Sequence, residues 1–302
     1  MASTLDDALK SAVSRLAARG DSARAEAEEL LGRLLDLPRT DLYLQRTRVL
    51  SATEWQRLDS WLRRRERGEP VQYVTGRAAF RGLDLAVDEN VLIPRPETEG
   101  LVEAVLATLR ERREAWPQPR VLDLGTGSGA LAVAIAAEWP AAAVTATDAS
   151  EAALAVARAN AAACGVAARI QLAHGAWFDA IAADDRFEVI VSNPPYIAEG
   201  ERGQLPADVR EHEPAEALFS GASGLEALRE IVDQAPRHLV AGGLLALELA
   251  EMRAAEVATW LEGAHDWESA RLIDDLAGRP RVLTAHRAIG PAIAPAQWGE
   301  AR

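Results

Sequence analysis

A strand, a glycine-rich turn and a helix follow one another in residues 121–136, and this segment constrains the fold more than any other. It reads VLDLGTGSGALAVAIA, in which Gly125, Gly127 and Gly129 alternate with other residues. Glycines there permit the left-handed backbone of a tight turn and let a ligand approach the backbone at the N-terminus of the helix. The segment therefore predicts one unit of a parallel α/β sheet, with a ligand site at the turn.

Short apolar runs alternate with helical patterns along the rest of the chain. The runs cover residues 121–124, 143–147, 169–172, 187–191 and 244–249. This alternation predicts an α/β, Rossmann-like fold with a parallel sheet and helices on both faces. Two further runs, near residues 269–273 and 281–286, follow one another with no helix between them, which predicts a terminal antiparallel strand pair.

The N-terminal part of the chain has a helical pattern instead. Leu5, Leu9, Ala12, Val13 and Leu16 share the spacing of one helix face. A second helical pattern covers residues 21–38, and a third begins with the capping-box sequence Ser51-Ala52-Thr53-Glu54. These patterns predict a small helical bundle, which serves either as a stabilising appendage or as a module that recognises a partner.

The changes of pattern predict four parts. Residues 1–68 are the helical bundle. Residues 69–95 are a β-hairpin linker, because they combine β-branched and aromatic residues with punctuating glycines. Residues 96–289 are the α/β domain, and residues 290–302 are a tail.

Charge excludes several classes of function. The 302 residues include 33 Lys and Arg against 46 Asp and Glu, so the net charge is −13, and the pI is near 5.0. Such an acidic chain is poorly suited to bind nucleic acid directly or to adhere to an anionic membrane. We therefore expect neither as a partner.

Metal-binding and targeting signals are absent from the sequence. Cys164 is the one cysteine and the five histidines lack ligand spacing, so we expect no metal site. The first residues include Asp6 and Asp7 and lack the apolar segment of a secretory signal. No apolar run reaches the roughly 18 residues that span a bilayer. These features predict a cytoplasmic protein.

The glycine turn and the end of the next strand together predict a nucleoside ligand. The turn has the pattern Gly-X-Gly-X-Gly after Asp123, which differs from the dinucleotide fingerprint and is the form of S-adenosylmethionine (AdoMet) binders. Asp148 ends the next apolar run, where a carboxylate can accept hydrogen bonds from both hydroxyls of a ribose. We therefore expect AdoMet as the cofactor.

The sequence Ser192-Asn193-Pro194-Pro195-Tyr196 follows the fourth apolar run, at an edge that faces the same crevice. The Asn193 side-chain oxygen and the Pro194 carbonyl can each accept one N–H of a planar amide or aromatic amine, and Tyr196 can cover the planar group. The prolines fix the backbone and remove competing donors. The motif thus predicts methyl transfer to a planar nitrogen.

These motifs make the chain similar to the bacterial PrmC/HemK protein-(glutamine-N5) methyltransferases, which modify the glutamine of the Gly-Gly-Gln motif in peptide chain release factors. The matching stretches are EPVQYVTG (69–76), FRGLDLAVDENVLIPRPETE (80–99), LDLGTGSGALA (122–132), VSNPPYI (191–197), DVREHEPAEAL (208–218) and RVLTAHR (281–287). The resemblance implies AdoMet as methyl donor, release factors as protein substrate, and a bundle that helps to dock them. We expect the protein to act as a monomer.

The resemblance also implies roles for single residues. The turn would line the methionine and ribose of AdoMet with Gly125, Thr126, Gly127, Ser128 and Gly129. Asp148 would hold the ribose and Trp177 would pack on the adenine. The substrate glutamine would be held by Asn193, Pro194, Pro195 and Tyr196. Among these, Asn193, Pro194 and Tyr196 would be the catalytic residues, and Asn193 would also lie beside the cofactor.

Two positions depart from the family pattern, and more than one function stays open. Ala176 replaces the acidic residue that precedes the tryptophan, and the sequence Glu248-Leu249-Ala250 differs locally. The segment 94–99, PRPETE, favours the release-factor branch over glutamine methyltransferases that act on a ribosomal protein. The sequence is also compatible with an N6-adenine nucleic-acid methyltransferase and with a protein that only binds AdoMet.

Overall fold

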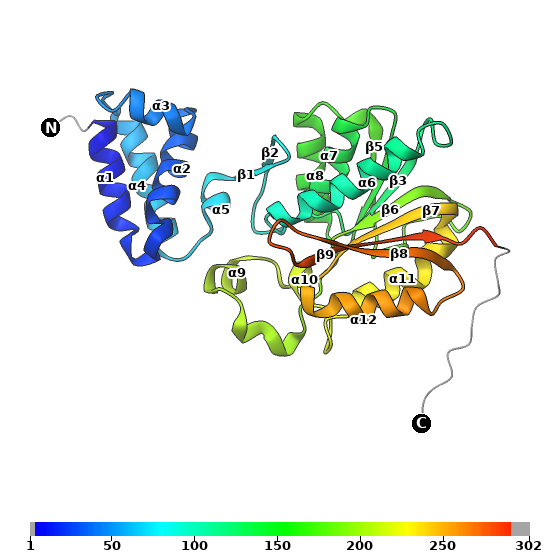
Figure 1. Ribbon diagram of the computed structural model, residues 1–302. Coiled ribbons are helices and arrows are strands. Elements are labelled where there is room, and N and C mark those ends of the chain that lie inside the picture. Colours follow the sequence, from blue (N-terminus) through cyan, green and yellow to red (C-terminus); the bar gives the residue numbers. More distant parts are fainter. Residues whose placement is uncertain (1–3, 291–302) are drawn as a thin grey trace. The chain divides into compact units, whose positions relative to one another are not determined.

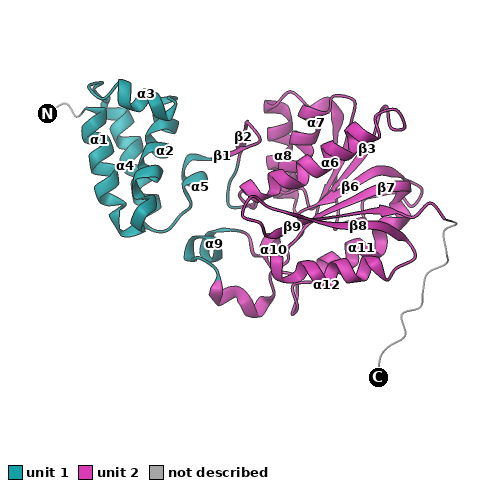
Figure 2. Ribbon diagram, viewed as in Figure 1, with its two compact units in different colours: residues 1–77, 87–89, 205–213 teal, residues 78–86, 90–204, 214–302 magenta. Residues whose placement is uncertain are grey.

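The computed structural model describes residues 4–290 and divides into two compact units, which Figure 2 shows in different colours. Unit 1 comprises residues 1–77, 87–89 and 205–213, and unit 2 comprises residues 78–86, 90–204 and 214–302. Of the predicted tail at 290–302, all but residue 290 lie outside the described residues. The predicted division at residues 68, 95 and 289 stays a prediction.

Unit 1 is built from helices (Figure 1). The longer ones are α1 (Leu5–Arg15), α2 (Ala23–Leu35) and α4 (Ala52–Glu66), and the shorter ones are the 3-10 helix η1 (Ala17–Ser22), α3 (Arg39–Leu44), α5 (Val71–Thr75) and α9 (Ala207–His212). Leucines and alanines at helical spacing bury their side chains between α1, α2 and α4. Fully buried examples are Leu5, Ala12, Leu30, Leu31, Leu58 and Leu62.

Two of these helices begin at capping boxes. The box predicted at Ser51 is confirmed, because the Glu54 N–H donates to Ser51 Oγ at 3.2 Å and the Ser51 N–H donates to Glu54 Oε2 at 2.6 Å. A second box, which we did not predict, joins Thr4 and Asp7 at the start of α1. Each box satisfies backbone donors that a helix start leaves without partners.

Part of the segment predicted as a hairpin is helical. Residues 71–75 form α5, which begins after Pro70 and ends before Gly76, whose φ is +74°. A proline before the first turn and a left-handed glycine after the last turn are typical helix boundaries. The two-stranded sheet that follows consists of β1 (Arg77–Phe80) and β2 (Leu83–Ala86).

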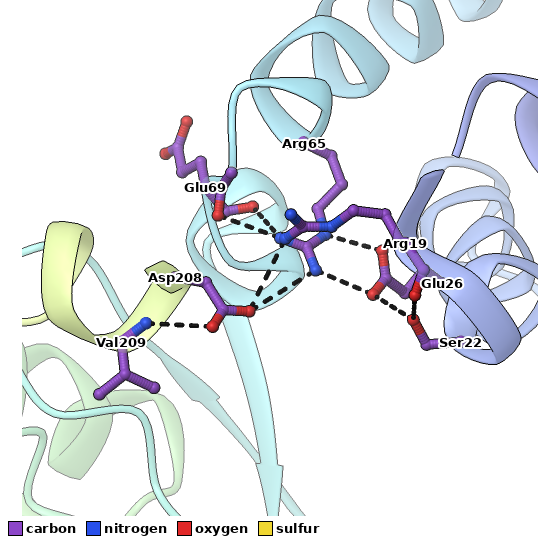
Figure 3. Close-up of polar contacts among 8 residues, drawn as sticks. Arg19, Ser22, Glu26, Arg65, Glu69, Asp208 and Val209 are labelled. Atoms are coloured by element: carbon purple, nitrogen blue, oxygen red, sulfur yellow. Dashed lines mark hydrogen bonds and ion pairs between the residues drawn. The ribbon is translucent and has the colours of Figure 1, made fainter. Parts of the chain in front are cut away.

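A buried arginine joins helices of unit 1 (Figure 3). The Arg65 guanidinium donates to both carboxylate oxygens of Glu26, at 2.7 and 2.9 Å, and to the carbonyls of Gly68 and Glu69 at 3.1 Å. Burial would raise the pKa of Glu26, but the hydrogen bonds and charge of Arg65 lower it overall. The buried cation is thus neutralised and hydrogen-bonded on several sides.

The same arginine contacts a segment that is remote in the sequence. Asp208 of α9 forms ion pairs with Arg65 and with Arg19, each with an N···O distance of 3.7 Å (Figure 3). Residues 205–213 therefore pack with the helices of unit 1, although the chain on either side of them belongs to unit 2.

Unit 2 contains a seven-stranded sheet in the order β5-β4-β3-β6-β7-β9-β8. Its strands are β3 (Arg120–Leu124), β4 (Ala143–Asp148), β5 (Ile170–His174), β6 (Phe187–Ser192), β7 (Leu239–Glu248), β8 (Trp267–Asp274) and β9 (Pro280–Arg287). The first five are parallel, and β9 is antiparallel to both β7 and β8. The predicted α/β fold with a terminal antiparallel pair is confirmed.

Helices cover both faces of this sheet (Figure 1). On one face lie α6 (Glu99–Glu111), α7 (Ala130–Glu138) and α8 (Glu151–Ala163), and on the other lie α11 (Glu226–His238) and α12 (Glu251–Glu262). Side chains of β3 point to both faces of the sheet. Val121 packs in the core beneath α6 and α7, and Leu122 and Leu124 pack in the core beneath α11 and α12. The short helix α10 (Ala215–Leu218) lies in the chain between β6 and α11.

Within residues 4–290, no helix combines the length and the apolar character that a membrane crossing requires.

Candidate active site

The strand order brings the two predicted motifs to one edge of the sheet. Strand β3 pairs with β4 on one side and with β6 on the other, with Leu124 opposite both Thr147 and Ser192. In parallel sheets, ligands bind beyond the carboxyl ends of the strands where the chain order changes direction. The glycine turn after β3 and the Asn-Pro-Pro-Tyr motif after β6 therefore lie side by side at that edge.

Hydrogen bonds from the second strand hold the glycine turn. The Thr126 N–H donates to the Thr147 carbonyl at 2.9 Å, and the Gly127 N–H donates to Asp148 Oδ2 at 2.8 Å. Gly125, Gly127 and Gly129 have φ angles of +68°, +54° and +80°, which residues with a Cβ rarely adopt. The turn is thus fixed in a conformation that exposes its backbone to a ligand.

The buried carboxyl of Asp123 also holds the glycine turn in place. Asp123 is fully buried and its Oδ2 accepts from Thr126 Oγ1 at 2.6 Å and from the Ala132 N–H at 3.2 Å. Its Oδ1 has no hydrogen-bond partner in residues 4–290. Burial raises the pKa of Asp123 to about 7, against the lowering effect of these two hydrogen bonds.

Asn160 of α8 fixes the other end of the turn. Its Nδ2 donates to the carbonyls of Ser128 and Ala86, at 2.8 and 2.9 Å, and its Oδ1 accepts from the Ala86 N–H at 2.7 Å. The side chain is buried and uses its donor and acceptor groups on backbone atoms. It therefore ties the glycine turn to the strand β2.

Trp177 lies against the turn. Its carbonyl accepts from Thr147 Oγ1 at 2.9 Å, and its φ is +43°, an unusual value for a residue with a side chain. A Cβ at Gly125 would lie 3.2 Å from Cζ3 of the Trp177 ring. Glycine at position 125 therefore leaves room for the Trp177 indole beside the turn.

A cavity of about 280 Å³ opens at this edge. Eight of the predicted site residues line it, namely Gly125, Thr126, Gly127, Ser128, Asp148, Trp177, Asn193 and Pro195. Ala176, at the position of the acid that the family pattern carries, also lines it. The structure thus brings residues predicted to bind the nucleoside, together with Asn193 and Pro195 of the second motif, to one cavity.

Three predicted residues lie outside the cavity lining. Gly129 stands at the start of α7, with Ala157 against the place of its missing Cβ. Pro194 is buried. The Tyr196 hydroxyl donates to Glu248 Oε1 at 3.4 Å, and burial raises the pKa of Tyr196, so its phenol stays protonated and can donate.

Further lining residues were not predicted. Eight of them come from the segment before α6, as Asn90, Val91, Leu92, Pro94 and Thr98, and from the start of α10, as Pro214, Glu216 and Ala217. Apart from Ala176, the others are Ala130, Leu131, Ala149, Ser150 and Ala153. The first eight fall in the stretches 80–99 and 208–218, which carried part of the resemblance. The signal was therefore present, but no local pattern assigned these residues to the site.

Among residues 4–290, no three side chains of His, Cys, Asp or Glu are grouped to hold a metal ion.

Comparisons with known proteins agree along the length of the chain. Residues 7–76 match the family described as PrmC N-terminal domain, and residues 102–209 match the family described as Methyltransferase small domain. A release factor glutamine methyltransferase of Cereibacter sphaeroides is 43% identical over 280 residues, which are 92% of this chain and 97% of that protein. One of Koribacter versatilis is 40% identical, covering 94% of this chain and 99% of that protein.

Solved structures share the fold. The hMettl16 catalytic domain in complex with MAT2A 3'UTR hairpin 6 has a TM-score of 0.54 at 14% identity, covering 82% of this chain and 87% of that chain. At so low an identity, this likeness shows the methyltransferase fold and nothing about the acceptor.

Proposed function

The chain belongs to the release factor glutamine methyltransferase family, and we propose that it transfers a methyl group from AdoMet to the N5 amide nitrogen of the glutamine in the Gly-Gly-Gln motif of peptide chain release factors. One observation carries the assignment of the site. A single cavity is lined by the glycine turn and Asp148 and also by Asn193 and Pro195. This supports a binding site for the methyl donor directly beside a hydrogen-bond acceptor for the planar N–H group of the substrate.

The residues of the cavity fit AdoMet. The open glycine turn suits the methionine and ribose, and the carboxylate of Asp148 suits the ribose hydroxyls. Trp177 offers an aromatic face for the adenine. AdoMet, when bound there, supplies a methyl group on a positively charged sulfur.

The motif after β6 would orient the substrate. Asn193 Oδ1 and the Pro194 carbonyl each accept one N–H of the glutamine amide, which turns the nitrogen lone pair toward the methyl group. No strong base would be needed, because the nitrogen becomes acidic only as its bond to the methyl carbon forms and the carbon–sulfur bond breaks, which leaves a neutral sulfur. The methylated nitrogen would then release one proton to solvent. Asn193 and Pro194 would contribute mainly by holding the glutamine nitrogen in place beside the methyl donor, because correct positioning of reacting groups can supply a large part of a rate enhancement.

Release factors act in translation, so we place the protein in the cytoplasm. The helical domain at residues 1–68 would help to dock the release factor, as the family resemblance implies. The net charge of −13 counts against a nucleic-acid base as the acceptor, although such a base offers a similar planar N–H2 group.

Methyl transfer to purified acceptors tests this function. The full chain is incubated with AdoMet carrying a labelled methyl group and with a release factor, the same factor with its motif glutamine replaced by alanine, ribosomal proteins, RNA or duplex DNA. We expect label only on the unaltered release factor. Label on RNA or DNA and none on protein would refute the proposal and favour the N6-adenine methyltransferase, and label on a ribosomal protein alone would favour the ribosomal-protein glutamine methyltransferase.

The variant Asn193→Ala separates transfer from binding. We expect it to bind AdoMet with nearly the wild-type dissociation constant while transfer falls below detection. Equal loss of AdoMet binding and transfer would show that Asn193 does not have the role of orienting the substrate.

A further inference from the structure

The Asn193 side chain has two chemically opposite ends. Its Oδ1 accepts hydrogen bonds and its Nδ2 donates them. Only Oδ1 can receive an N–H of a substrate amide, so the amide group must be held in one of its two orientations. The residues beside Asn193 therefore decide whether it presents the acceptor.

Thr98 is the neighbour of the donor end. It lies in the 3-10 turn η2 (Pro96–Thr98) before α6, its side chain is buried, and it lines the same cavity as Asn193. The Asn193 Nδ2 donates to Thr98 Oγ1 at 3.3 Å. The two residues are 95 positions apart in the sequence and meet at the edge of the sheet.

Glu248 lies behind Thr98. It is the last residue of β7, it is 1% exposed, and its carboxyl is hydrogen-bonded to the Thr98 side chain and to the Tyr196 hydroxyl. Its Oε2 has no hydrogen-bond partner in residues 4–290. Burial raises the pKa of Glu248, but a carboxyl keeps an acceptor oxygen whether it is ionised or protonated.

The direction of these hydrogen bonds follows from a count of protons. The Thr98 hydroxyl has a single hydrogen, and when it donates this hydrogen to the Glu248 carboxylate it can only accept from Asn193, which agrees with the bond from Asn193 Nδ2. If the Asn193 amide were reversed, Oδ1 would face Thr98 Oγ1 with no hydrogen between them. Two facing acceptors in a buried place cost free energy, because neither finds a donor.

We propose that Thr98 and Glu248 are positioning residues that hold the Asn193 amide with its Oδ1 presented to the substrate. The proposal rests on the function proposed above. It also accounts for selection of an amide, because an oriented acceptor attracts the N–H2 of glutamine and repels the carboxylate of glutamate, which has the same shape. Tyr196, which shares the Glu248 carboxyl, is part of the same network.

Two pairs of variants test the proposal in the full-length enzyme. Thr98→Val removes the hydroxyl at nearly constant shape, and Thr98→Ser keeps it. Glu248→Leu removes the acceptor behind the hydroxyl, and Glu248→Gln keeps an acceptor oxygen. The matched control is Thr108→Val on α6, because the Thr108 hydroxyl donates to the Ala104 carbonyl of its own helix at 3.2 Å and does not line the cavity.

Each variant is assayed for kcat and KM with AdoMet and a release factor, and for AdoMet affinity by calorimetry. We expect Thr98→Val and Glu248→Leu to lower kcat about 10- to 100-fold, as a misplaced catalytic group does, with AdoMet affinity within about threefold of wild type. Thr98→Ser and Glu248→Gln should recover most of kcat. Thr108→Val should match wild type.

Several outcomes would overturn the proposal. One is a kcat of Thr98→Val close to wild type, and another is a Thr98→Ser variant as impaired as Thr98→Val. A third is loss of AdoMet affinity in step with kcat, which would indicate a structural role in the donor site. If Thr98→Val does not fold, the Glu248 pair decides by the same criteria. A wild-type enzyme that leaves release factors unmethylated would instead refute the proposed function, and this inference with it.

Discussion

The backbone N–H of Gly127 donates to Asp148 Oδ2 at 2.8 Å, which ties the turn after β3 to the end of β4. The other oxygen of Asp148, Oδ1, accepts from the Ser150 N–H at 2.9 Å. Each carboxylate oxygen still has acceptor capacity for a ribose hydroxyl. One side chain thus fixes the glycine turn and presents a negative charge to the cavity.

We expect Asp148→Asn to weaken AdoMet binding. The substitution keeps an acceptor for Gly127 but replaces hydrogen bonds to a charged group, each of which contributes about 1.5–3 kcal/mol, by weaker neutral ones. Calorimetry should show an AdoMet dissociation constant roughly 10- to 100-fold higher, with kcat at saturating AdoMet nearly unchanged. Asp184→Asn, at an exposed carboxylate away from the cavity lining, is the control. Unchanged AdoMet affinity in Asp148→Asn would contradict the assigned role.

Gly125→Ala should impair both stability and AdoMet binding. A residue with a Cβ at a φ of +68° costs about 1–2 kcal/mol, and the new Cβ would lie 3.2 Å from the Trp177 ring. We expect Trp177 to shift and AdoMet affinity to fall at least about tenfold.

Gly278→Ala separates the two effects of that substitution. Gly278 has a similar φ of +75° and open space around it. It should lose a similar amount of stability and keep wild-type AdoMet affinity. If Gly125→Ala behaves like Gly278→Ala in binding, the contact with Trp177 has no part in the donor site.

Asp123 should make stability depend on pH in a defined window. Its pKa is raised from 3.8 to about 7 by burial, so the folded state holds the proton more tightly than the unfolded state. Its stabilising contribution is therefore complete below pH 3.8 and is lost as the pH rises through about 7. At about 1.4 kcal/mol per pH unit, the loss amounts to roughly 4 kcal/mol.

Urea unfolding of wild type and Asp123→Asn from pH 4 to 8, without AdoMet, measures this. The variant lacks the titrating group, so its free energy of unfolding relative to wild type should rise with pH. A difference that stays constant across this range would show that the Asp123 pKa is not raised.

Arg65→Ala should destabilise unit 1. The guanidinium is 6% exposed and its removal leaves the carboxylate of Glu26 without its partner in a largely buried place. Breaking a buried ion pair costs about 3–5 kcal/mol, which denaturant unfolding will detect. The control is Arg63→Ala on the same helix, where the side chain is 67% exposed and pairs with Asp59, and the expected change is below about 1 kcal/mol. Equal effects of the two variants would contradict the structural role of Arg65.

Local patterns predicted much of the fold. The capping box at Ser51 was visible because both partners lie within one helical turn. The short helices α3 and α5 were not predicted, because 5- or 6-residue helices have too few positions to show a period. In α5, the signals at Pro70 and Gly76 also suit a turn or a hairpin.

The sequence likewise predicted some features of the candidate site and not others. The glycine turn, Asp148 and Asn193 were predicted because each stands at the end of an apolar run, and strand ends in a parallel sheet meet at one edge. The position of the Tyr196 hydroxyl was not, because its partner Glu248 is 52 residues away and belongs to another strand.

The sequence by itself determined the α/β architecture, the helical N-terminal part and the two motifs proposed to hold the methyl donor and the substrate, because periodicity, turn chemistry and strand ends are local properties. Only the tertiary structure decided that Thr98 contacts both Asn193 and Glu248, and that residues 205–213 pack with the helices of unit 1. Such contacts depend on strand order and on side-chain packing between segments that are distant in the sequence. No local pattern encodes them, and by the proposal above they set the direction in which the half-buried Asn193 amide points.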